Sequence, residues 1–565
     1  MMDYKQQLAA ALTTASGLDE NEILPLIEVP ADTAMGDYAF PCFKLAKALR
    51  KAPPAIAADI ESRLVHPAFI AKVQVVGAYI NFFLDRTRYA LDVLAEMDAQ
   101  GEGFGGGSEG AGRVVCIDYS SINIAKPFHI GHLSTTVIGH SLYRIYGFLG
   151  YKPVGINHLG DWGTQFGKLI VAYKKWGSDA LIEAGTINAM LELYVRFHEE
   201  AEKDESLNDE ARAWFKKIED GDAEALDIFS RFKELTLKEV GKVYDLLGVH
   251  FDSYAGESFY NDKMQPVIDE LKDKNLLEPS EGAYIVRLPD DMPPCVILKS
   301  DGATLYSTRD LAAAFYRKNT YDFYKCLYVV AYQQNLHFKQ WFKVVELMGY
   351  DWAKDLEHVA FGMVSLEDGT LSTRRGKVVF LQDVLDQAVE KTRSIIEEKS
   401  PGLENKDEVA KTVGVGAVVF DALSSARIKD IVFSFDRVLN FDGETGPYVQ
   451  YTHARCASLL RRADAAWTQT APDYNALDNA EAFTAVKLLQ SFPDTVQRAC
   501  EKNEPYLITR HVIELAKAMN RFYYEHRIID EDAAGTAARL KLAQAVKQVI
   551  KTGLWLIGVD APERM

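Results

Sequence analysis

The 565-residue sequence is poor in cysteine and in long apolar runs, and it has no excess of positive charge. Its six cysteines, at positions 42, 116, 295, 326, 456 and 500, are too sparse for a disulfide framework and too far apart for paired metal ligands. No apolar run reaches the roughly 18 residues of a membrane span, and no basic and apolar leader pattern is seen. We therefore expect reduced thiols, no structural metal, no membrane partner and a soluble cytoplasmic protein.

The formal net charge of −18 argues against binding nucleic acid by bulk electrostatics. The acidic excess is uneven, however. Residues 441–565 hold 15 Lys and Arg against 16 Asp and Glu, so this quarter carries only −1 of the total. Within it, residues 520–527 mix aromatic and arginine side chains that suit stacking on unpaired RNA bases. The same pattern also fits an amphipathic helix with an aromatic core face.

The length exceeds what one hydrophobic core can serve, so several domains are expected. Glycine fills seven of the twelve positions from 101 to 112, a composition that resists ordering and predicts a linker. Before it, helices predicted at 44–49 and 54–64 and strands within 73–84 indicate a compact α+β module. The Gly-x-Gly-x-x-Gly pattern at 101–106 precedes a strand, whereas a dinucleotide site must follow one, so we reject it as a cofactor site.

A strand, a loop and a helix start follow the linker. Residues 114–117 are apolar, residues 118–126 are polar, and a helix is predicted from about Gly131. In a parallel sheet such a junction offers free N–H groups to phosphate. His129 and His132 are three apart and can face one ligand, while Gly131 lets the backbone approach a base closely. The alternative is two surface histidines near a helix start.

Polar residues also follow later strand candidates. The segment 154–165 repeats the strand-and-loop pattern, and the apolar strand at 326–330 is followed by Gln334 and His337. Such positions share the carboxyl edge of a parallel sheet. Tyr306 and Asp310 lie four apart at another predicted helix start, where they can share a face.

Two further segments complete the pattern. Residues 178–275 are charged, helical and poor in glycine, which predicts a helical insertion without chemistry of its own. The loop at 368–377 offers Ser372, Thr373 and Arg374 beside glycines, and small hydroxyls with cations suit a lid over polyphosphate. A solvated basic hairpin is the alternative.

These residues together resemble the arginyl-tRNA synthetase family, a group of class I aminoacyl-tRNA synthetases. The resemblance lies in the segments 123–133, 158–167, 371–376, 446–451 and 561–565. It implies a multidomain α/β protein: an N-terminal α+β module, a Rossmann-like parallel-sheet catalytic domain with a helical insertion, and a C-terminal all-α helical bundle. The expected boundaries are 1–98 for a module that binds the tRNA elbow, 99–112 for the linker, 113–400 for the catalytic domain with its insertion at about 178–275, and 401–565 for the helical anticodon-binding region.

The resemblance also implies site residues, grouped by what they would bind. Those expected to bind arginine are Asp118, Asn123, His129, Tyr306, Asp310 and Gln334. Those expected to bind ATP are His129, Gly131, His132, Met363, Val364 and Arg374. The catalytic set is Lys126, His129, His132, Ser372, Thr373 and Arg374. The residues expected to bind tRNA are Asn81, Phe82, Tyr448, Gln450, Arg455, Asn520 and Tyr523.

The implied reaction activates L-arginine with ATP and transfers it to the 3′-terminal ribose of tRNA(Arg). ATP with Mg²⁺ would be the substrate, and we expect a monomer. Two alternatives remain. A non-catalytic tRNA-binding paralogue is raised by Ser134, which stands where the family usually has arginine. Another class I synthetase is the second, although the acidic candidates Asp118 and Asp310 favour a cationic amino acid.

Overall fold

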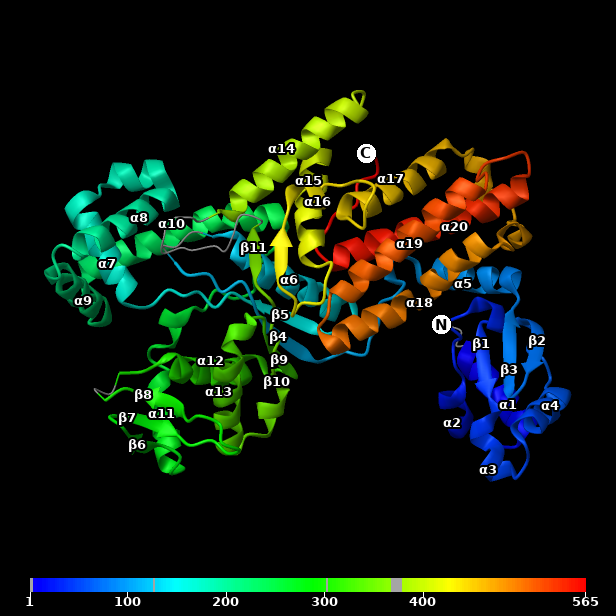
Figure 1. Ribbon diagram of the computed structural model, residues 1–565. Helices are drawn as coiled ribbons and strands as arrows, with labels where there is room; N and C mark the ends of the chain where they lie inside the picture. Colours follow the sequence, from blue (N-terminus) through cyan, green and yellow to red (C-terminus); the bar gives the residue numbers. More distant parts are fainter. Residues whose placement is uncertain (1–3, 125–127, 301–302, 367–378) are drawn as a thin grey trace. The chain divides into compact units, whose positions relative to one another are not determined.

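The computed structural model describes residues 4–124, 128–300, 303–366 and 379–565 of the chain (Figure 1). The chain forms two compact units, each assembled from segments that are distant in the sequence. The first comprises Met1–Phe104, Arg455–Phe492 and Glu514–Val549, and the second comprises Gly105–Ala454, Pro493–Ile513 and Ile550–Met565. No helix among the described residues is both long enough and apolar enough to cross a membrane.

The N-terminal part of the first unit is an α+β module, as the sequence predicts. Its antiparallel sheet has the order β1-β3-β2, with β1 at Tyr38–Pro41, β2 at Ile70–Val76 and β3 at Tyr79–Leu84. Gly77 has a φ of +60° in the tight turn between β2 and β3, a conformation that glycine adopts without steric cost. The helices are α1 (Tyr4–Ser16), α2 (Glu20–Ile23), α3 (Ala46–Leu49), α4 (Pro53–Arg63) and α5 (Arg86–Gln100).

The glycine-rich segment is ordered, so the prediction that its composition resists ordering is wrong. The backbone N–H of Gly107 donates to the carbonyl of Phe148 at 3.2 Å, and that of Gly110 donates to the carbonyl of Leu149 at 3.0 Å. A Cβ atom on Gly110 would lie 2.2 Å from the ring of Tyr151. Glycine at this position therefore allows close packing against the chain at 148–151.

The second unit contains a four-stranded parallel sheet, which confirms the Rossmann-like fold. The strand order is β10-β9-β4-β5, with β4 at Val114–Asp118, β5 at Lys152–Ile156, β9 at Lys325–Tyr328 and β10 at Leu356–His358. The central strand β4 is apolar and buried, as expected where helices cover both faces of a parallel sheet. The connecting helices are α6 (Leu133–Phe148), α12 (Tyr306–Tyr321) and α13 (Asn335–Leu347).

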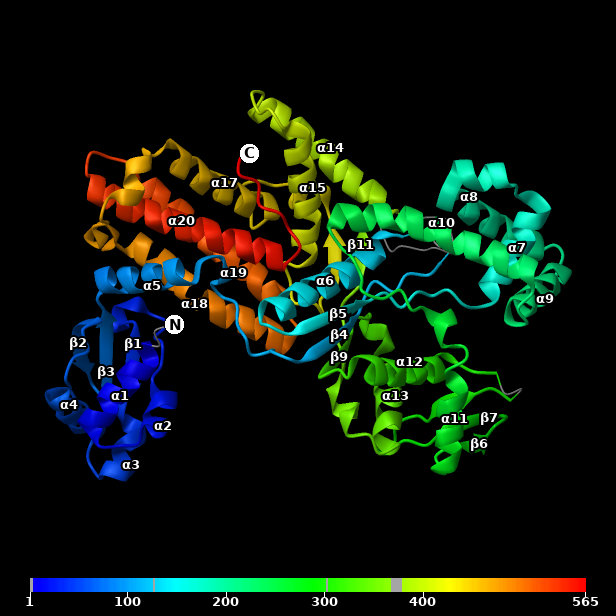
Figure 2. The ribbon, with the colours of Figure 1, turned by 180° about the vertical axis from the view of Figure 1, so that it is seen from behind.

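The region between β5 and α12 is mainly helical, which confirms the predicted helical insertion (Figure 2). Helices α7, α8 and α9 pack against one another and against the long helix α10. Their bounds, with those of the following elements, are α7 (Thr164–Trp176), α8 (Asp179–Ala201), α9 (Ser206–Glu219), α10 (Ala223–Leu247), α11 (Met264–Asp273), β6 (Glu278–Ser280), β7 (Ala283–Val286) and β8 (Cys295–Leu298). The last three form an antiparallel sheet in the order β6-β7-β8.

The regular elements in the rest of the described chain are helices and one small parallel pair of strands. That pair is β11 (Val364–Leu366) with β12 (Ile431–Phe433). The helices are α14 (Leu381–Lys399), α15 (Lys406–Ala422), α16 (Phe435–Val438), α17 (Gly446–Arg462), α18 (Ala480–Lys502), α19 (Tyr506–Glu525) and α20 (Ala533–Leu556). The helical character predicted for the C-terminal region is therefore confirmed, with the short strand β12 as an exception.

Candidate active site

The two histidines that the spacing predicts to share a face lie side by side. His129 caps the short helix at Ile130–His132, where its Nδ1 accepts from the backbone N–H of Gly131 at 3.1 Å. The N–H of His129 in turn donates to Nδ1 of His132 at 3.3 Å, and the ring centroids are 4.1 Å apart. Because Nδ1 is the acceptor in both rings, the proton of a neutral ring sits on Nε2.

The histidine segment pairs with residues 379–381. Ile130 donates its N–H to the carbonyl of Val379 at 3.2 Å, and Leu381 donates to the carbonyl of Phe128 at 2.9 Å. The pairing is an isolated antiparallel bridge between His129 and Phe380. Residues 379–381 come soon after the predicted phosphate loop in the sequence, and the bridge joins the histidine segment to them.

Some candidates lie outside the described residues, namely Lys126, Ser372, Thr373 and Arg374. Met363 and Val364 precede the phosphate loop. The N–H of Met363 donates to Asp430 at 2.7 Å, and the carbonyl of Met363 accepts from Ile431 at 2.8 Å. Met363 is 38% exposed, whereas Val364 is buried in β11. These bonds fix the chain as it leads toward the loop.

Asp118, the last residue of β4, already has a cationic partner. Its Oδ2 accepts from the buried guanidinium of Arg317 at 2.7 Å, and its Oδ1 accepts from the hydroxyl of Ser121 at 2.7 Å. Burial is the largest single effect and opposes the charge of Arg317, but Asp118, with further contributions from Tyr328, Tyr260 and Cys326, holds the pKa of Arg317 well above its usual value. The sequence shows no sign of this pair, because Arg317 follows Asp118 by 199 residues.

The loop after β4 is strained and held from several sides. Ser120 and Ser121 both have positive φ, at 68° and 44°, which is unfavourable for residues with a side chain. The Ser120 N–H donates to the hydroxyl of Thr135 at 3.0 Å, and the Ser120 hydroxyl lies 2.7 Å from that of Tyr244. Asn157, after β5, also donates to the Tyr244 hydroxyl, at 2.9 Å. Tyr244 thus brings the helical insertion, from which no chemistry was expected, to the strand ends.

The loops after β4 and β5 are joined by backbone hydrogen bonds. Asn123 and Gly160 form an isolated parallel bridge, and Gly160 donates to the carbonyl of Ile122 at 2.8 Å. A Cβ on Gly160 would lie 2.5 Å from Oδ1 of Asn123, so the amide of Asn123 is held closely against this glycine. Asn123 therefore lies where the loop after β4 meets the loop after β5.

Asp310 lies on α12 opposite His337 of α13. Oδ2 of Asp310 and Nε2 of His337 are 2.5 Å apart, and each side chain is 27% exposed. Tyr306, one turn before Asp310, is 71% exposed. Gln334 is also exposed and precedes α13 directly. The two helix starts thus present one partly buried carboxylate and two exposed polar side chains.

A second acidic group lies near this carboxylate. Burial raises the pKa of Glu257 to about 7, an effect opposed by Arg309 and reinforced by the carboxylates of Asp161 and Asp310. Asp161 is fully buried and pairs with Lys233 at 2.6 Å. Glu257 therefore changes charge near neutral pH beside the candidate arginine site.

Three candidates for tRNA contact meet in the first unit. The guanidinium of Arg455 donates to Oδ1 of Asn520 and lies 5.0 Å from the ring centroid of Tyr523. Tyr523 is 38% exposed, and the neighbouring Tyr524 is 85% exposed. A cation held beside accessible aromatic rings suits stacking on RNA bases.

Three other candidates for tRNA contact require correction. Asn81 and Phe82 are only 2% and 0% exposed, because they lie on the central strand β3 of the N-terminal sheet. Gln450 is also fully buried, and its amide donates to the carbonyls of Thr412 at 3.3 Å and Asp560 at 2.7 Å. In this structure these three side chains are not accessible to RNA. Tyr448, by contrast, is only half-buried.

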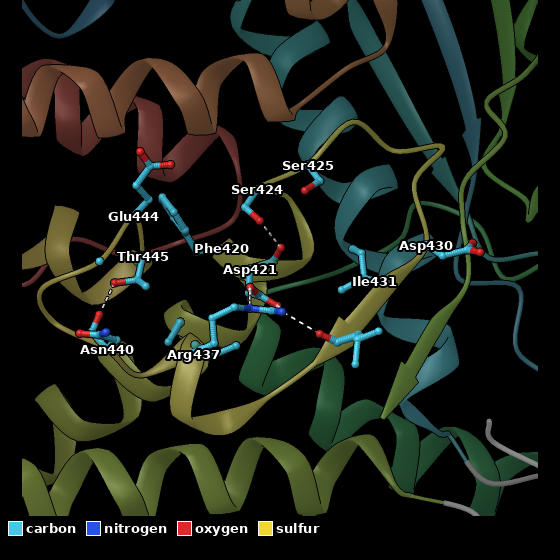
Figure 3. Close-up of a pocket in the computed structure, with 15 residues that line it drawn as sticks. Phe420, Asp421, Ser424, Ser425, Asp430, Ile431, Arg437, Asn440, Glu444 and Thr445 are labelled. Carbon is cyan, nitrogen blue, oxygen red and sulfur yellow. Dashed lines mark hydrogen bonds and ion pairs between the residues drawn. The ribbon is translucent and has the colours of Figure 1, made fainter. Parts of the chain in front are cut away.

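A cavity of about 460 Å³ lies beside β12 in the second unit (Figure 3). Arg437 and Asp421 both line it, and the guanidinium of Arg437 donates to Oδ2 of Asp421 at 2.9 Å. Burial raises the pKa of Asp421, and Arg437 opposes this shift. None of the candidates among the described residues lines this cavity, so we do not assign it to the chemistry.

Metal-binding groups are scarce around the site. Among the residues that the structure describes, no group of three or more His, Cys, Asp or Glu side chains could hold a metal ion. The six cysteines are all buried, and none of them forms a disulfide bond.

Known families match nearly all of the chain. Residues 100–435 match the family described as tRNA synthetases class I (R), catalytic domain. Residues 449–565 match the DALR anticodon binding domain, and residues 2–84 match the arginyl tRNA synthetase N terminal domain.

Individual proteins match over the full length. The chain is 55% identical to an arginine–tRNA ligase of Alkaliphilus metalliredigens and 53% identical to one of Halothermothrix orenii, each over 100% of both chains. The solved arginyl-tRNA synthetase of Thermus thermophilus matches with a TM-score of 0.81 at 25% identity, covering 100% of both chains. On these matches the chain belongs to the arginyl-tRNA synthetase family of class I aminoacyl-tRNA synthetases.

Proposed function

We propose that the protein is an arginine–tRNA ligase. It activates L-arginine with ATP to arginyl-adenylate, releasing pyrophosphate, and then transfers the arginyl group to the 3′-terminal ribose of tRNA(Arg), releasing AMP. The observation that carries the proposal is the identity of 51–55% to arginine–tRNA ligases over the whole chain. The paired histidines beside residues 379–381 support the ATP side of the site.

In the first step the carboxylate of arginine attacks the α-phosphate of ATP, the new C–O–P bond forms, and the bond to pyrophosphate breaks. This reaction needs positioning and stabilisation of charge but no covalent enzyme nucleophile. His129, Gly131 and His132 hold the adenylate, with Met363 and Val364 beside the nucleotide. Arg374, with the hydroxyls of Ser372 and Thr373, stabilises the leaving pyrophosphate, and Lys126 adds a positive charge.

Arginine is recognised by acceptors that match its planar cation. Asp310 accepts from the guanidinium in a charge-assisted hydrogen bond, which distinguishes arginine from neutral amino acids. Asn123, Tyr306 and Gln334 supply further polar contacts. Because both oxygens of Asp118 already have partners, we propose that Asp118 contributes by holding Arg317 and Ser121 at the strand end.

Magnesium enters this proposal only with the substrate. The described residues offer no cluster of protein ligands for it. Mg²⁺ prefers phosphate oxygens and water with one or two carboxylates, so it is proposed to arrive bound to ATP.

For tRNA, we propose that Arg455, Asn520, Tyr523 and Tyr448 contact the anticodon arm. We also propose a function for each domain. Residues 1–98 bind the tRNA elbow, residues 99–112 connect the domains, residues 113–400 carry out catalysis, and residues 401–565 bind the anticodon. We further propose that the protein acts as a cytoplasmic monomer.

One assay tests the proposal against its two rivals. Purified protein is incubated with ATP, total tRNA and each of the twenty amino acids in turn, and charging of tRNA and release of AMP are measured. We expect charging with arginine alone. Charging with another amino acid indicates a different class I synthetase. Tight tRNA binding without arginine-dependent AMP indicates the non-catalytic paralogue, in which the buried Ser134 is the departure to test first.

A further inference from the structure

Asp310 and His337 link the two helix starts at the candidate arginine site. The two helices, α12 and α13, each contribute one of these side chains at 2.5 Å. Equal exposure of 27% means that solvent or a ligand reaches both groups. A hydrogen bond this direct controls how the carboxylate is oriented.

Only one oxygen of Asp310 is engaged in this way. His337 contacts Oδ2, and within the described part of the chain Oδ1 has no hydrogen-bond partner. An arriving guanidinium can therefore donate to Oδ1 and to the remaining lone pair of Oδ2. The side-on geometry of such a pair depends on the plane of the carboxylate, which the imidazole holds.

We propose that His337 is a positioning residue that sets both the orientation and the effective charge of Asp310 toward the guanidinium of arginine. The proposal rests on the function proposed above. When neutral, His337 donates its Nε2–H to Asp310 and fixes the acceptor plane. When protonated, it forms an ion pair that offsets the carboxylate charge and competes with the substrate cation.

This competition couples arginine binding to the loss of a proton. A protonated His337 and the guanidinium of arginine would both donate to the same carboxylate. Arginine favours the neutral state of His337, because two cations cannot share one carboxylate without repulsion. The KM for arginine should therefore rise as pH falls, while the KM for ATP should not follow it.

Other ionisable groups face this pair and must be separated from it. Glu257, His158 and Cys295 lie within electrostatic reach of Asp310, and His358 lies within reach of His337. Among these, burial raises the pKa of Glu257 to about 7, so it changes charge within the pH range of the experiment. A variant at Glu257 is therefore part of the design.

The experiment compares two substitutions at one position between pH 6 and 8.5. His337→Gln places an amide Nε2–H where the imidazole Nε2–H was but cannot ionise, whereas His337→Ala removes the donor. At pH 8.5 we expect the glutamine variant to keep the wild-type KM for arginine within about twofold and the alanine variant to raise it about tenfold, the size of one lost hydrogen bond to a charged group. In both variants kcat should change little.

The pH dependence of the KM for arginine then distinguishes the effect of His337 on the orientation of Asp310 from the effect of its charge. In the wild type the arginine KM should rise by up to about tenfold per pH unit on the acidic side, as for one competing proton. In His337→Gln that rise should disappear. If His337→Gln keeps the full rise and Glu257→Gln removes it, the proton belongs to Glu257 and the proposal for His337 is overturned.

Asp310→Asn separates failure of this proposal from failure of the proposed function. It should raise the arginine KM by at least tenfold, while Asp322→Asn, at the exposed far end of the same helix, should not. Wild-type protein that fails to charge tRNA with arginine overturns the proposed function. An arginine KM that responds to Asp310→Asn but not to either change at His337 overturns only the positioning role.

Discussion

Asp118 and Arg317 form an ion pair of 2.7 Å at the carboxyl end of β4, with side chains only 8% and 1% exposed. The Arg317 guanidinium also lies 5.3 Å from the ring centroid of Tyr328. A site proposed to bind a cationic amino acid thus has a permanent cation next to one of its carboxylates. Because this cation offsets Asp118, we expect the more accessible carboxylate of Asp310 to meet the substrate.

The first prediction concerns the stability of this buried pair. Asp118→Asn leaves the charge of Arg317 buried without a counter-ion, so the free energy of unfolding should fall by about 3–5 kcal/mol. Asp209→Asn is the matched control, because Asp209 pairs with Arg212 on an exposed helix surface and should cost under about 1 kcal/mol. Chemical denaturation of the three proteins measures the difference.

Adding Arg317→Met to Asp118→Asn should recover part of the loss, since the stranded charge is then absent. A double variant less stable than the single one would show that packing of the Arg317 stem, and not its charge, dominates.

The second prediction concerns the histidine pair. His132→Ala removes one ring of the pair that is proposed to hold the adenylate, so arginine-dependent adenylate formation should slow by about 100-fold, as for a lost group that stabilises transition-state charge. The thermal midpoint should stay close to that of the wild type, because His132 is only half-buried. His66→Ala, at an exposed position in the N-terminal module, is the control. Full activity in His132→Ala would remove this ring from the nucleotide site.

Local patterns in the sequence predict the elements that carry the site. The apolar run at 114–117 is observed as β4, and the spacing of His129 and His132 predicts two adjacent rings, because residues three apart at a helix start lie on one face. Backbone periodicity and glycine placement are short-range properties. They can be recognised without knowing which segments pack together.

Long-range contacts could not be predicted in this way. From the sequence alone, Arg317 is an ordinary cation on a predicted helix and Tyr244 is part of a charged insertion. In the structure both side chains contact residues at the strand ends. The burial of Phe82 and Gln450 shows the converse limit. A resemblance identifies a position in a family but not how exposed its side chain is, because exposure depends on which distant elements cover it.

The third prediction concerns stability in acid. Burial in α6, with smaller contributions from Arg144 and His250, lowers the pKa of His140 to about 3. The unfolded chain takes up a proton at this position below the ordinary histidine value, and the folded chain does not. Stability should therefore be lost progressively as pH falls from about 6.5 toward 3, by up to about 1.4 kcal/mol per pH unit.

His140→Leu removes this proton and tests the prediction. Among the described residues neither ring nitrogen of His140 has a hydrogen-bond partner, so leucine forfeits no such bond. Between pH 7 and 5 the free energy of unfolding should fall by about 2 kcal/mol more in the wild type than in the variant. The other titrating groups are the same in both proteins, so their effects cancel in this comparison. Parallel stability curves for the two proteins would assign the acid sensitivity elsewhere.

The fourth prediction compares Arg455, which is proposed to contact tRNA, with Gln450, which the resemblance also suggested but which is buried. Arg455→Ala removes the guanidinium beside Tyr523, so the KM for tRNA should rise about tenfold, while the KM for arginine stays unchanged.

Gln450→Ala is the matched comparison on the same helix. It removes two internal hydrogen bonds from a fully buried amide, so it should lower the thermal midpoint by several degrees, because about 1 kcal/mol is lost for each bond. Its KM for tRNA at a temperature where it is folded should stay near the wild-type value. Arg455→Ala should therefore change the KM for tRNA, whereas Gln450→Ala should change the thermal midpoint. A selective rise in the tRNA KM for Gln450→Ala, without a loss of stability, would mean that this side chain leaves its internal partners to meet RNA.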